Sequence, residues 1–248
     1  MALETRQRLF CDTPLGANAA LTLDRELSHY LINVLRYQAG QEVLVFNGKD
    51  GEYLATIEAA DRKKTALICH HQTRPQDPMP TLMLGFAPIK KARIDFIAEK
   101  ATELGVGILQ PMMTDYTQVN RVNTDRLLAN AIEAAEQTGR TTLPEILSPC
   151  PLLDLLEDWP KNRHIIFCDE DCAGSAQHDF AHQVAGISGD VAILIGPEGG
   201  FSPRERQAIM ALDGVVPVSL GRNILRADTA MLAALALWQG FAGDWKES

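Results

Sequence analysis

Two short runs of mainly apolar residues lie close together in the first part of this 248-residue chain. Residues 42–46 and 52–58 are rich in β-branched and aromatic side chains, and the turn-forming segment Asn-Gly-Lys-Asp-Gly separates them. This pattern predicts a hairpin within a small β-barrel. A helix is expected over residues 24–37. Its apolar face would consist of Leu27, Leu31, Val34 and Leu35.

Three prolines then fall within residues 73–80, which disfavours both a helix and a central strand. We expect an extended linker here, with one domain over residues 1–73 and a second over residues 74–248. Beyond the linker, short apolar runs alternate with helical patterns, which is typical of an α/β domain with a mainly parallel sheet. The expected strands cover residues 81–86, 164–169, 191–195 and 215–220.

Three helices are expected in the second domain. The first begins at Pro88 and ends at Gly105, the second is capped by Thr124 and ends at Gly139, and the third covers residues 229–241. Apolar residues recur at helical spacing in the first two helices: Ile94, Ile97, Ala101 and Leu104, then Leu128, Ile132 and Ala135.

The strongest local signal is the loop Gly-Pro-Glu-Gly-Gly at residues 196–200, directly after an expected strand. Its two adjacent glycines leave backbone amides open to a ligand. Ser202, Pro203 and Glu205 then have the spacing of a helix N-cap, a first-turn proline and a capping box. The loop lacks the spacing of the common phosphate-binding loops, so a ligand without phosphate is expected. Taken alone, it is better explained as a tight strand-to-helix turn that binds nothing.

A second loop, residues 219–226, follows the strand expected at residues 215–220, and Asp228 or Thr229 can cap the helix after it. Parallel strands end at one edge of their sheet, where α/β proteins bind ligands. The two loops are therefore expected to form one site.

The net charge of −9 argues against a protein that holds nucleic acid by bulk electrostatics. Residues 1–74 contain nine Lys/Arg and nine Asp/Glu, so the acidic excess belongs to the rest of the chain. RNA contacts would have to come from local basic clusters. The chain has no signal-peptide pattern and no apolar run of roughly 20 residues, so we expect a cytoplasmic protein.

The cysteines are odd in number and scattered, which favours free thiols over disulfides. They are Cys11, Cys69, Cys150, Cys168 and Cys172. The last two, taken with His178 and His182, do not have a standard zinc spacing, and we expect no metal.

Read together, the two loops resemble the paired motifs of the RsmE family, the small-subunit ribosomal RNA uridine-N3 methyltransferases of the SPOUT superfamily. The first motif matches at residues 195–205 and the second at residues 219–230. The other blocks of the family match in order at residues 28–36, 46–48, 100–106 and 136–140. The second motif departs in two places. Arg222 and Asn223 stand where the family has Pro-Arg, and Asp228 stands where it has glutamate.

The resemblance implies a C-terminal SPOUT domain, an α/β methyltransferase domain with a trefoil knot, behind an N-terminal PUA-like β-barrel that binds RNA. It also implies S-adenosyl-L-methionine as cofactor, a homodimer, and 16S rRNA in the small ribosomal subunit as partner. The cofactor contacts that it implies are Leu194, Ile195, Gly196, Glu198, Gly200, Ser219, Leu220, Gly221, Ile224 and Leu225. Asp169 or Glu170 is a further candidate.

Methylation of uridine N3 requires loss of its proton, and the resulting negative charge spreads over the two flanking carbonyl groups. We expect Arg226 to stabilise that charge, and Glu198 or Asp228 to accept or orient the proton. The alternatives are that Arg226 braces its loop through an ion pair and that Asp228 is only a helix cap.

Basic residues of both domains are candidates for RNA contact. They are Arg6, Arg8, Arg25, Arg36, Lys90, Lys91, Arg93 and Arg140. Cations in the first turns of a helix oppose its dipole, which suggests a phosphate partner for those that follow Pro88, although a solvated basic face would look the same. His29 and Tyr30 could stack on bases. Methylation of another base or of a ribose 2'-hydroxyl stays open, as does a non-catalytic RNA-binding assembly factor.

Overall fold

The computed structural model describes residues 6–89 and 91–247. The chain folds into two compact units. The first comprises Met1–Met79 and Ala135–Leu143, and the second comprises Pro80–Ala134 and Pro144–Ser248. Nothing in the sequence pattern had indicated that residues 135–143 belong with the N-terminal strands.

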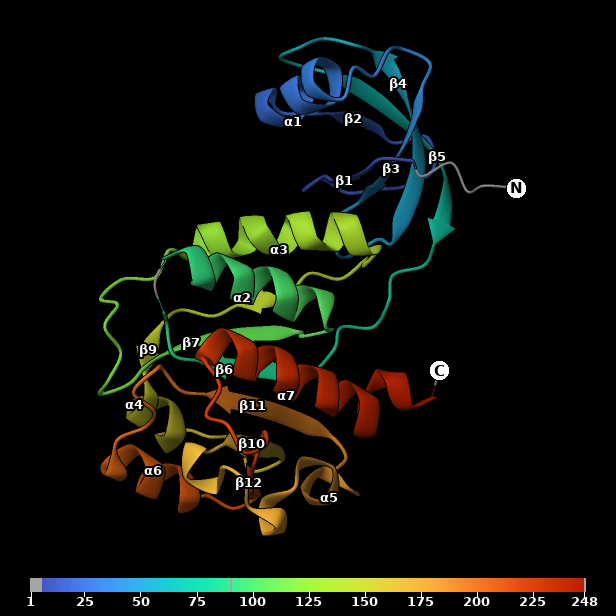
Figure 1. Ribbon diagram of the computed structural model, residues 1–248. Helices are drawn as coiled ribbons and strands as arrows, with labels where there is room; N and C mark the ends of the chain where they lie inside the picture. Colours follow the sequence, from blue (N-terminus) through green and yellow to red (C-terminus); the bar gives the residue numbers. More distant parts are fainter. Residues whose placement is uncertain (1–5, 90, 248) are drawn as a thin grey trace. The chain divides into compact units, whose positions relative to one another are not determined.

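The first unit contains a curled five-stranded sheet (Figure 1). Its strand order is β1 (Arg8–Phe10), β3 (Glu42–Phe46), β4 (Glu52–Ala59), β5 (Ala66–Arg74) and β2 (Ala20–Thr22). The predicted hairpin is confirmed, since β3 and β4 pair antiparallel and Gly48 and Gly51 have φ of +80° and +83° in the turn between them. Alternate strand residues such as Val43 and Val45 are fully buried and form the core of this unit.

The helical segment of the first unit begins as predicted but ends earlier. Asp24 caps α1 (Arg25–His29), and the chain continues as the π-helix η1 (Tyr30–Val34). The N–H of Leu35 donates to the carbonyl oxygen of Tyr30 at 2.9 Å, a five-residue step that rotates the following side chains off the α-helical phase. Val34, expected in the core, is therefore 57% exposed.

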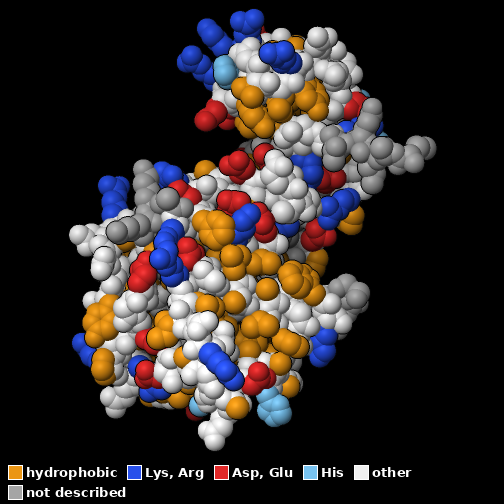
Figure 2. All heavy atoms as spheres, viewed as in Figure 1, with side chains coloured by type: hydrophobic (Ala, Val, Ile, Leu, Met, Phe, Trp, Pro, Cys, Tyr) orange, Lys and Arg blue, Asp and Glu red, His pale blue; other side chains and the backbone are white. Residues whose placement is uncertain are grey.

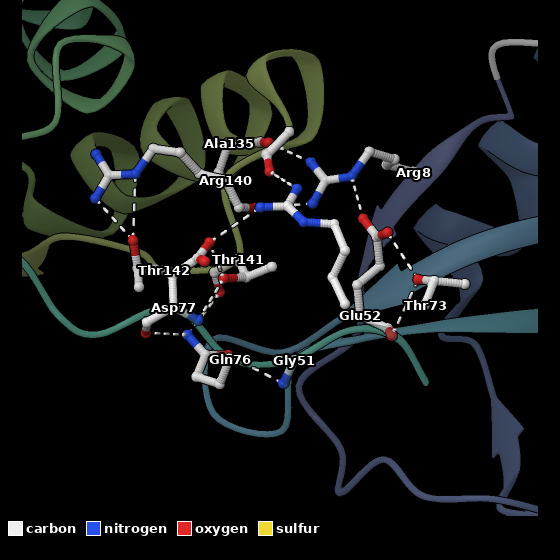
Figure 3. A network of polar contacts seen from close by, with 12 residues as sticks. Arg8, Gly51, Glu52, Thr73, Gln76, Asp77, Ala135, Arg140, Thr141 and Thr142 are labelled. Carbon is white, nitrogen blue, oxygen red and sulfur yellow. Dashed lines mark hydrogen bonds and ion pairs between the residues drawn. The ribbon is translucent and has the colours of Figure 1, made fainter. Parts of the chain in front are cut away.

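A buried ion pair joins β1 to β4 in this unit (Figure 3). Nε of Arg8 lies 2.6 Å from Oε2 of Glu52, and Oε1 of Glu52 accepts a hydrogen bond from Thr73 at 2.8 Å. The remaining guanidinium N–H groups of Arg8 donate to the backbone carbonyl oxygens of residues 135, 136 and 140. This network is what ties residues 135–143 to the strands.

The second unit is built on a parallel sheet. Its strand order is β12 (Val215–Val218), β10 (Arg163–Cys168), β11 (Asp190–Ile195), β6 (Met83–Phe86), β7 (Ile108–Met113) and β8 (Glu145–Ile146), and β9 (Cys150–Pro151) pairs with β7. The four strands expected from the sequence are confirmed as β6, β10, β11 and β12. Strand β7 was not expected, because Gln110 and Pro111 interrupt its apolar run.

Helices cover both faces of this sheet (Figure 1). One apolar cluster joins the sheet to α2 (Lys91–Glu103), α5 (Phe180–Val184) and α7 (Ala227–Phe241). A second cluster joins the opposite face to α4 (Leu152–Glu157) and α6 (Pro203–Met210). The remaining helical segments are α3 (Thr124–Thr138), η2 (Glu170–Cys172), η3 (Ala176–His178) and η4 (Asp244–Glu247).

The start of α2 differs from the prediction. The helix begins at Lys91 rather than Pro88, because residues 87–89 are not helical and the side chain of Ile89 is buried in the core. The N–H of Ala87 donates to the carbonyl oxygen of Ile195 at 3.0 Å, which prolongs the sheet at the point where the helix was expected.

In α3 the expected C-terminal stop is confirmed, with Gly139 at φ +77°. The predicted cap was wrong by one residue, since Oδ1 of Asn123, not Thr124, accepts the N–H of Arg126 at 3.0 Å. The predicted buried face is confirmed at Ala135, but Leu128 is 38% exposed and Leu127 is buried in its place.

Candidate functional site

A cavity of about 250 Å³ opens at the carboxyl ends of β10, β11 and β12, which are neighbours in the sheet. Residues 195–200, from the end of β11 onward, and residues 220, 221 and 223–225, after β12, line it from two sides, as expected. Residues 168–170 and Ala173, which end and follow β10, form a third side. The first turn of α7 completes the wall through Ala227 and Ala230.

Most of the expected cofactor contacts line this cavity. They are Ile195, Gly196, Glu198, Gly200, Leu220, Gly221, Ile224 and Leu225. Leu194 instead belongs to the apolar cluster beneath α4 and α6. Ser219 braces the second loop, because its N–H donates to the carbonyl oxygen of His178 at 2.7 Å and its Oγ accepts the N–H of Gly174 at 3.2 Å.

The first loop is anchored where α6 begins. Ser202 and Glu205 form the predicted capping box, in which Oγ of Ser202 accepts the N–H of Glu205 and Oε2 of Glu205 accepts the N–H of Ser202 at 2.9 Å. Oε1 of Glu205 also accepts the N–H of Asp115 at 2.8 Å. The helix that follows the loop is thereby fixed against the segment after β7.

The segment after β10 holds the same loop from the other side. Oε1 of Glu170 accepts the N–H of Phe201 at 3.2 Å. Asp169 is buried and binds Arg206 of α6, with 2.8 Å between Nη2 and Oδ2, and this carboxylate raises the pKa of the Arg206 guanidinium. Asp169 and Glu170, only further candidates from the sequence, therefore both belong to the wall of the cavity.

Sequence reasoning missed the lining residues outside the two loops. They are Cys168, Ala173, Val218, Ala227 and Ala230. Cys168 and Val218 lie at strand ends, Ala173 follows η2, and Ala227 and Ala230 lie in the first turn of α7. The charged residues of the wall are all acidic: Asp169, Glu170 and Glu198. Such a wall suits a cationic ligand better than a phosphate.

The acidic candidates for catalysis meet one arginine. Nη1 of Arg93, on α2, lies 3.8 Å from Oε1 of Glu198, and its Nε lies 3.6 Å from Oδ2 of Asp228. Neither Asp228 nor Thr229 caps α7, because the helix begins at Ala227 and its N-cap is Arg226. Arg226 is exposed and takes part in no ion pair of the described residues, so the structure offers no support for a loop-bracing role.

The candidate RNA contacts differ in their surroundings. Arg25 and Arg36 are exposed, and Arg6 makes only an exposed ion pair with Glu42 at 2.8 Å. Arg8 is buried and committed to the Glu52 network, which argues against the RNA contact expected for it. The guanidinium of Arg93 faces the carboxylates of Glu198 and Asp228 and is only partly exposed to solvent.

The other predicted RNA contacts are Arg140, Lys90 and Lys91. Arg140 is partly buried, and its Nη2 donates to Oγ1 of Thr142 at 2.9 Å. Lys90 lies outside the described residues, and only the backbone of Lys91 is described. A basic run that the sequence reasoning passed over, Arg62 to Lys64, is exposed between β4 and β5. Figure 2 shows Lys and Arg side chains gathered at this end of the first unit.

The described part of the chain contains neither a candidate metal site nor a helix that could span a membrane. The five cysteines are free thiols. Within residues 6–89 and 91–247, no three His, Cys, Asp or Glu side chains are grouped so that they could hold a metal ion. In the same part of the chain, no helix has both the length and the apolar character needed to cross a bilayer.

Comparison with known proteins defines the class. The family described as "RNA methyltransferase domain" matches residues 75–239, and "RNA methyltransferase PUA domain" matches residues 23–68. The architecture is therefore that of an RNA methyltransferase with an α/β methyltransferase unit and a PUA-like unit, as expected.

Individual relatives narrow the class to one family. "Ribosomal RNA small subunit methyltransferase E" of Rickettsia conorii is 30% identical over 230 residues, which cover 92% of this chain and 93% of the relative. The crystal structure of the enzyme of that name from Neisseria gonorrhoeae, bound to S-adenosyl methionine, has a TM-score of 0.83 and 26% identity over 94% of this chain and 97% of its own. A Legionella pneumophila methyltransferase structure with bound SAM has a TM-score of 0.83 and 27% identity over 95% and 97%. The chain belongs to the ribosomal RNA small subunit methyltransferase E family.

Proposed function

We propose that this protein methylates N3 of a uridine in 16S rRNA of the small ribosomal subunit, with S-adenosyl-L-methionine as methyl donor. The observation that carries the proposal is the acid-walled cavity that both motif loops form at the carboxyl ends of β10, β11 and β12. The names of the relatives supply the class of RNA, and the resemblance of the motifs supplies the acceptor atom.

The lining of the cavity fits this cofactor. S-adenosyl-L-methionine carries a sulfonium and an ammonium group, and the charged wall residues are Asp169, Glu170 and Glu198. Leu220, Ile224 and Leu225 offer an apolar surface for an adenine ring. Gly196, Gly199 and Gly200 contribute only backbone to the wall, and the space that a Cβ would take at Gly196 and Gly200 is filled by Phe201 and Glu170. When bound, the cofactor supplies a methyl group, and the sulfonium that carried it departs as a neutral thioether.

The protein's own residues would manage the acceptor. We assign the N3 proton to a carboxylate, Glu198 at the cavity or Asp228 beside it, directly or through a water molecule. The N3 lone pair then forms the new bond to the methyl carbon. Arg226 would stabilise the negative charge on the uracil oxygens, and its exposed guanidinium is available for this.

We assign residues 1–73 to RNA binding and residues 74–248 to methyl transfer, in line with the matched ranges 23–68 and 75–239. We also propose a homodimer that uses the outer face of α7. Leu232 and Leu237 are only partly buried there, and Phe241 is 47% exposed. Figure 2 shows hydrophobic side chains gathered on this face of the second unit. A substrate of ribosomal RNA would place the protein in the cytoplasm.

The test is to incubate the protein and labelled cofactor with small subunits that lack their native methylation, and to map the product by mass spectrometry. We expect a single N3-methyluridine in 16S rRNA. Protein-free 16S rRNA is the matched control, and equal labelling of both would contradict action on the assembled particle. A methyl group on another base or on a ribose 2'-hydroxyl would keep the class of enzyme and change the acceptor.

Calorimetry with the cofactor separates the enzyme from a non-catalytic RNA-binding factor. Saturable binding supports the enzyme, whereas absence of binding would favour the RNA-binding factor.

A further inference from the structure

Arg93 bridges three elements that are far apart in the sequence. It lies on α2, Glu198 lies in the loop after β11, and Asp228 lies in the first turn of α7. Glu198 is a wall residue of the cavity, and Asp228 is two residues from another, Ala230. The guanidinium of Arg93 therefore stands beside the mouth of the proposed methyltransferase site.

The distances indicate what these contacts are for. Charge-assisted hydrogen bonds between nitrogen and oxygen are typically about 2.7–2.9 Å long. The Arg93 contacts are 3.8 Å and 3.6 Å, with the side chains of Arg93, Glu198 and Asp228 exposed by 35%, 54% and 20%. Ion pairs of this kind contribute roughly 0–1 kcal/mol to stability. The cluster therefore adds little to folding, and its placement calls for another explanation.

The charges also weigh against a plain phosphate contact. One guanidinium faces two carboxylates, so the trio carries a net charge of −1. A phosphate would have to displace these carboxylates to bind Arg93 directly, and would then lie beside them. The planar guanidinium presents its Nη1 to Glu198 and its Nε to Asp228. One guanidinium therefore faces two carboxylates from different elements through two different nitrogens.

We propose that Arg93 is a positioning residue of the methyltransferase site, which holds the carboxylate of Glu198 toward the cavity and fixes it relative to Asp228. This inference rests on the proposed function. It replaces the RNA contact that the sequence had suggested for Arg93. The effect of Arg93 passes through Glu198, so it disappears when Glu198 is neutral.

The first test needs no RNA and no turnover. Calorimetry compares the affinity for S-adenosylmethionine, which carries the sulfonium charge, with that for S-adenosylhomocysteine, which does not. We expect Arg93→Lys, which keeps the positive charge but presents one ammonium in place of two separate guanidinium nitrogens, to weaken binding of the charged ligand by about threefold or more relative to the neutral one, because a carboxylate released toward solvent attracts the sulfonium less. In a Glu198→Gln variant, adding the substitution at Arg93 should leave the ratio of the affinities for S-adenosylmethionine and S-adenosylhomocysteine unchanged.

The second test uses turnover on small subunits. We expect Arg93→Ala to lower kcat by about tenfold or more while KM for the subunit changes less than about threefold. The double variant with Glu198→Gln should be no slower than Glu198→Gln alone. Arg121→Ala, which removes an exposed arginine of the same unit, is the control for loss of general positive charge.

The outcomes are distinct. A rise in KM with unchanged kcat, or losses that multiply in the double variant, would overturn the inference in favour of a phosphate contact. Equal shifts of the affinity ratio in both backgrounds would overturn it too, as an effect not transmitted by Glu198. If the wild-type protein binds cofactor but methylates no small subunit, the proposed function fails, and the affinity ratio alone still decides the role of Arg93.

Discussion

The carboxylate of Glu170 occupies the space that a side chain at Gly200 would need. A Cβ built on Gly200 would overlap Oε1 of Glu170, and the backbone there has φ +69°, which favours glycine. Because Glu170 also accepts the N–H of Phe201, the loop after β11 and the segment after β10 are fixed to each other at this point. A side chain at position 200 would push the end of the Glu170 side chain aside and disturb its contact with the N–H of Phe201.

Gly200→Ala should therefore displace the first loop and weaken cofactor binding by about tenfold or more, equivalent to about 1.4 kcal/mol. Calorimetric titration measures the effect. Gly189→Ala is the matched control, since Gly189 has φ +87° with open space around it. It should cost stability through backbone strain and leave cofactor affinity unchanged. Similar affinity losses in both variants would mean that strain, and not the contact with Glu170, limits binding.

Arg8→Ala should destabilise the first unit strongly. The side chains of Arg8 and Glu52 are only 11% and 5% exposed, so the substitution leaves a buried carboxylate without its cation. Breaking such a pair typically costs about 3–5 kcal/mol. Urea unfolding followed by circular dichroism measures the change. Arg6→Ala, which breaks an ion pair exposed by 43% and 38%, should cost only about 0–1 kcal/mol; equal losses would refute the role given to burial.

The fold could be predicted wherever one periodicity dominated a segment. Strands β3 and β11 are clean apolar or alternating runs, and their positions followed from the sequence. Strand β7 was missed because Gln110 and Pro111 lie within it, and only its neighbours in the sheet make it a strand. The phase shift at η1 depends on backbone hydrogen bonds that side-chain pattern does not encode.

The candidate site likewise has features that the local sequence predicts and features that only the fold creates. Local rules were enough for the capping box at Ser202 and for the two glycine-bearing loops, because each is a matter of adjacent residues. The fixed position of Glu170 and the pairing of Arg93 with two carboxylates arise from strands and helices brought together in the fold. No spacing along the chain could have distinguished Arg93 from an arginine that binds phosphate.

Asp50 should make the first unit sensitive to acid. Its carboxylate accepts the N–H of Leu15 at 2.9 Å and the amide of Asn47 at 2.7 Å, and the former contact is the main reason why its pKa lies below 3.8. A lowered pKa in the folded state contributes stability above the unfolded value, and this is lost as the pH falls through the folded value.

The variant Asp50→Asn should accordingly have a lower Tm than the wild type at about pH 6, and the gap should close as the pH falls below the usual aspartate pKa of about 3.9. Thermal unfolding at a series of pH values gives both curves. A gap that stays constant down to the most acidic pH would show that the charge of Asp50 plays no part.

Ser202→Ala should loosen the start of α6. The hydroxyl accepts the N–H of Glu205 at 3.3 Å and donates to the carboxylate of Asp115, so its loss removes an N-cap and a partner of the β7 segment. N-cap losses cost about 0.5–2 kcal/mol. Denaturant unfolding should show this, with faster amide exchange in the first turn of α6. Ser188→Ala, at an exposed serine, should change neither quantity.

Arg226→Ala is expected to abolish turnover on small subunits while cofactor affinity stays within about twofold of the wild type. The reason is that Arg226 is exposed at the N-cap of α7 beside the cavity and is not one of its lining residues, so it can serve the acceptor without holding the cofactor. Single-turnover methylation and calorimetry measure the two quantities separately.

Arg222→Ala is the matched control, because Arg222 is an exposed arginine of the same loop. It also tests the departure from the family pattern at residues 222 and 223. If Arg226 alone stabilises the charge on uracil, Arg222→Ala should keep most of the turnover. Near-normal turnover of Arg226→Ala together with a large loss in Arg222→Ala would transfer the role to Arg222, and equal partial losses would indicate that both arginines act on the RNA rather than on the reacting base.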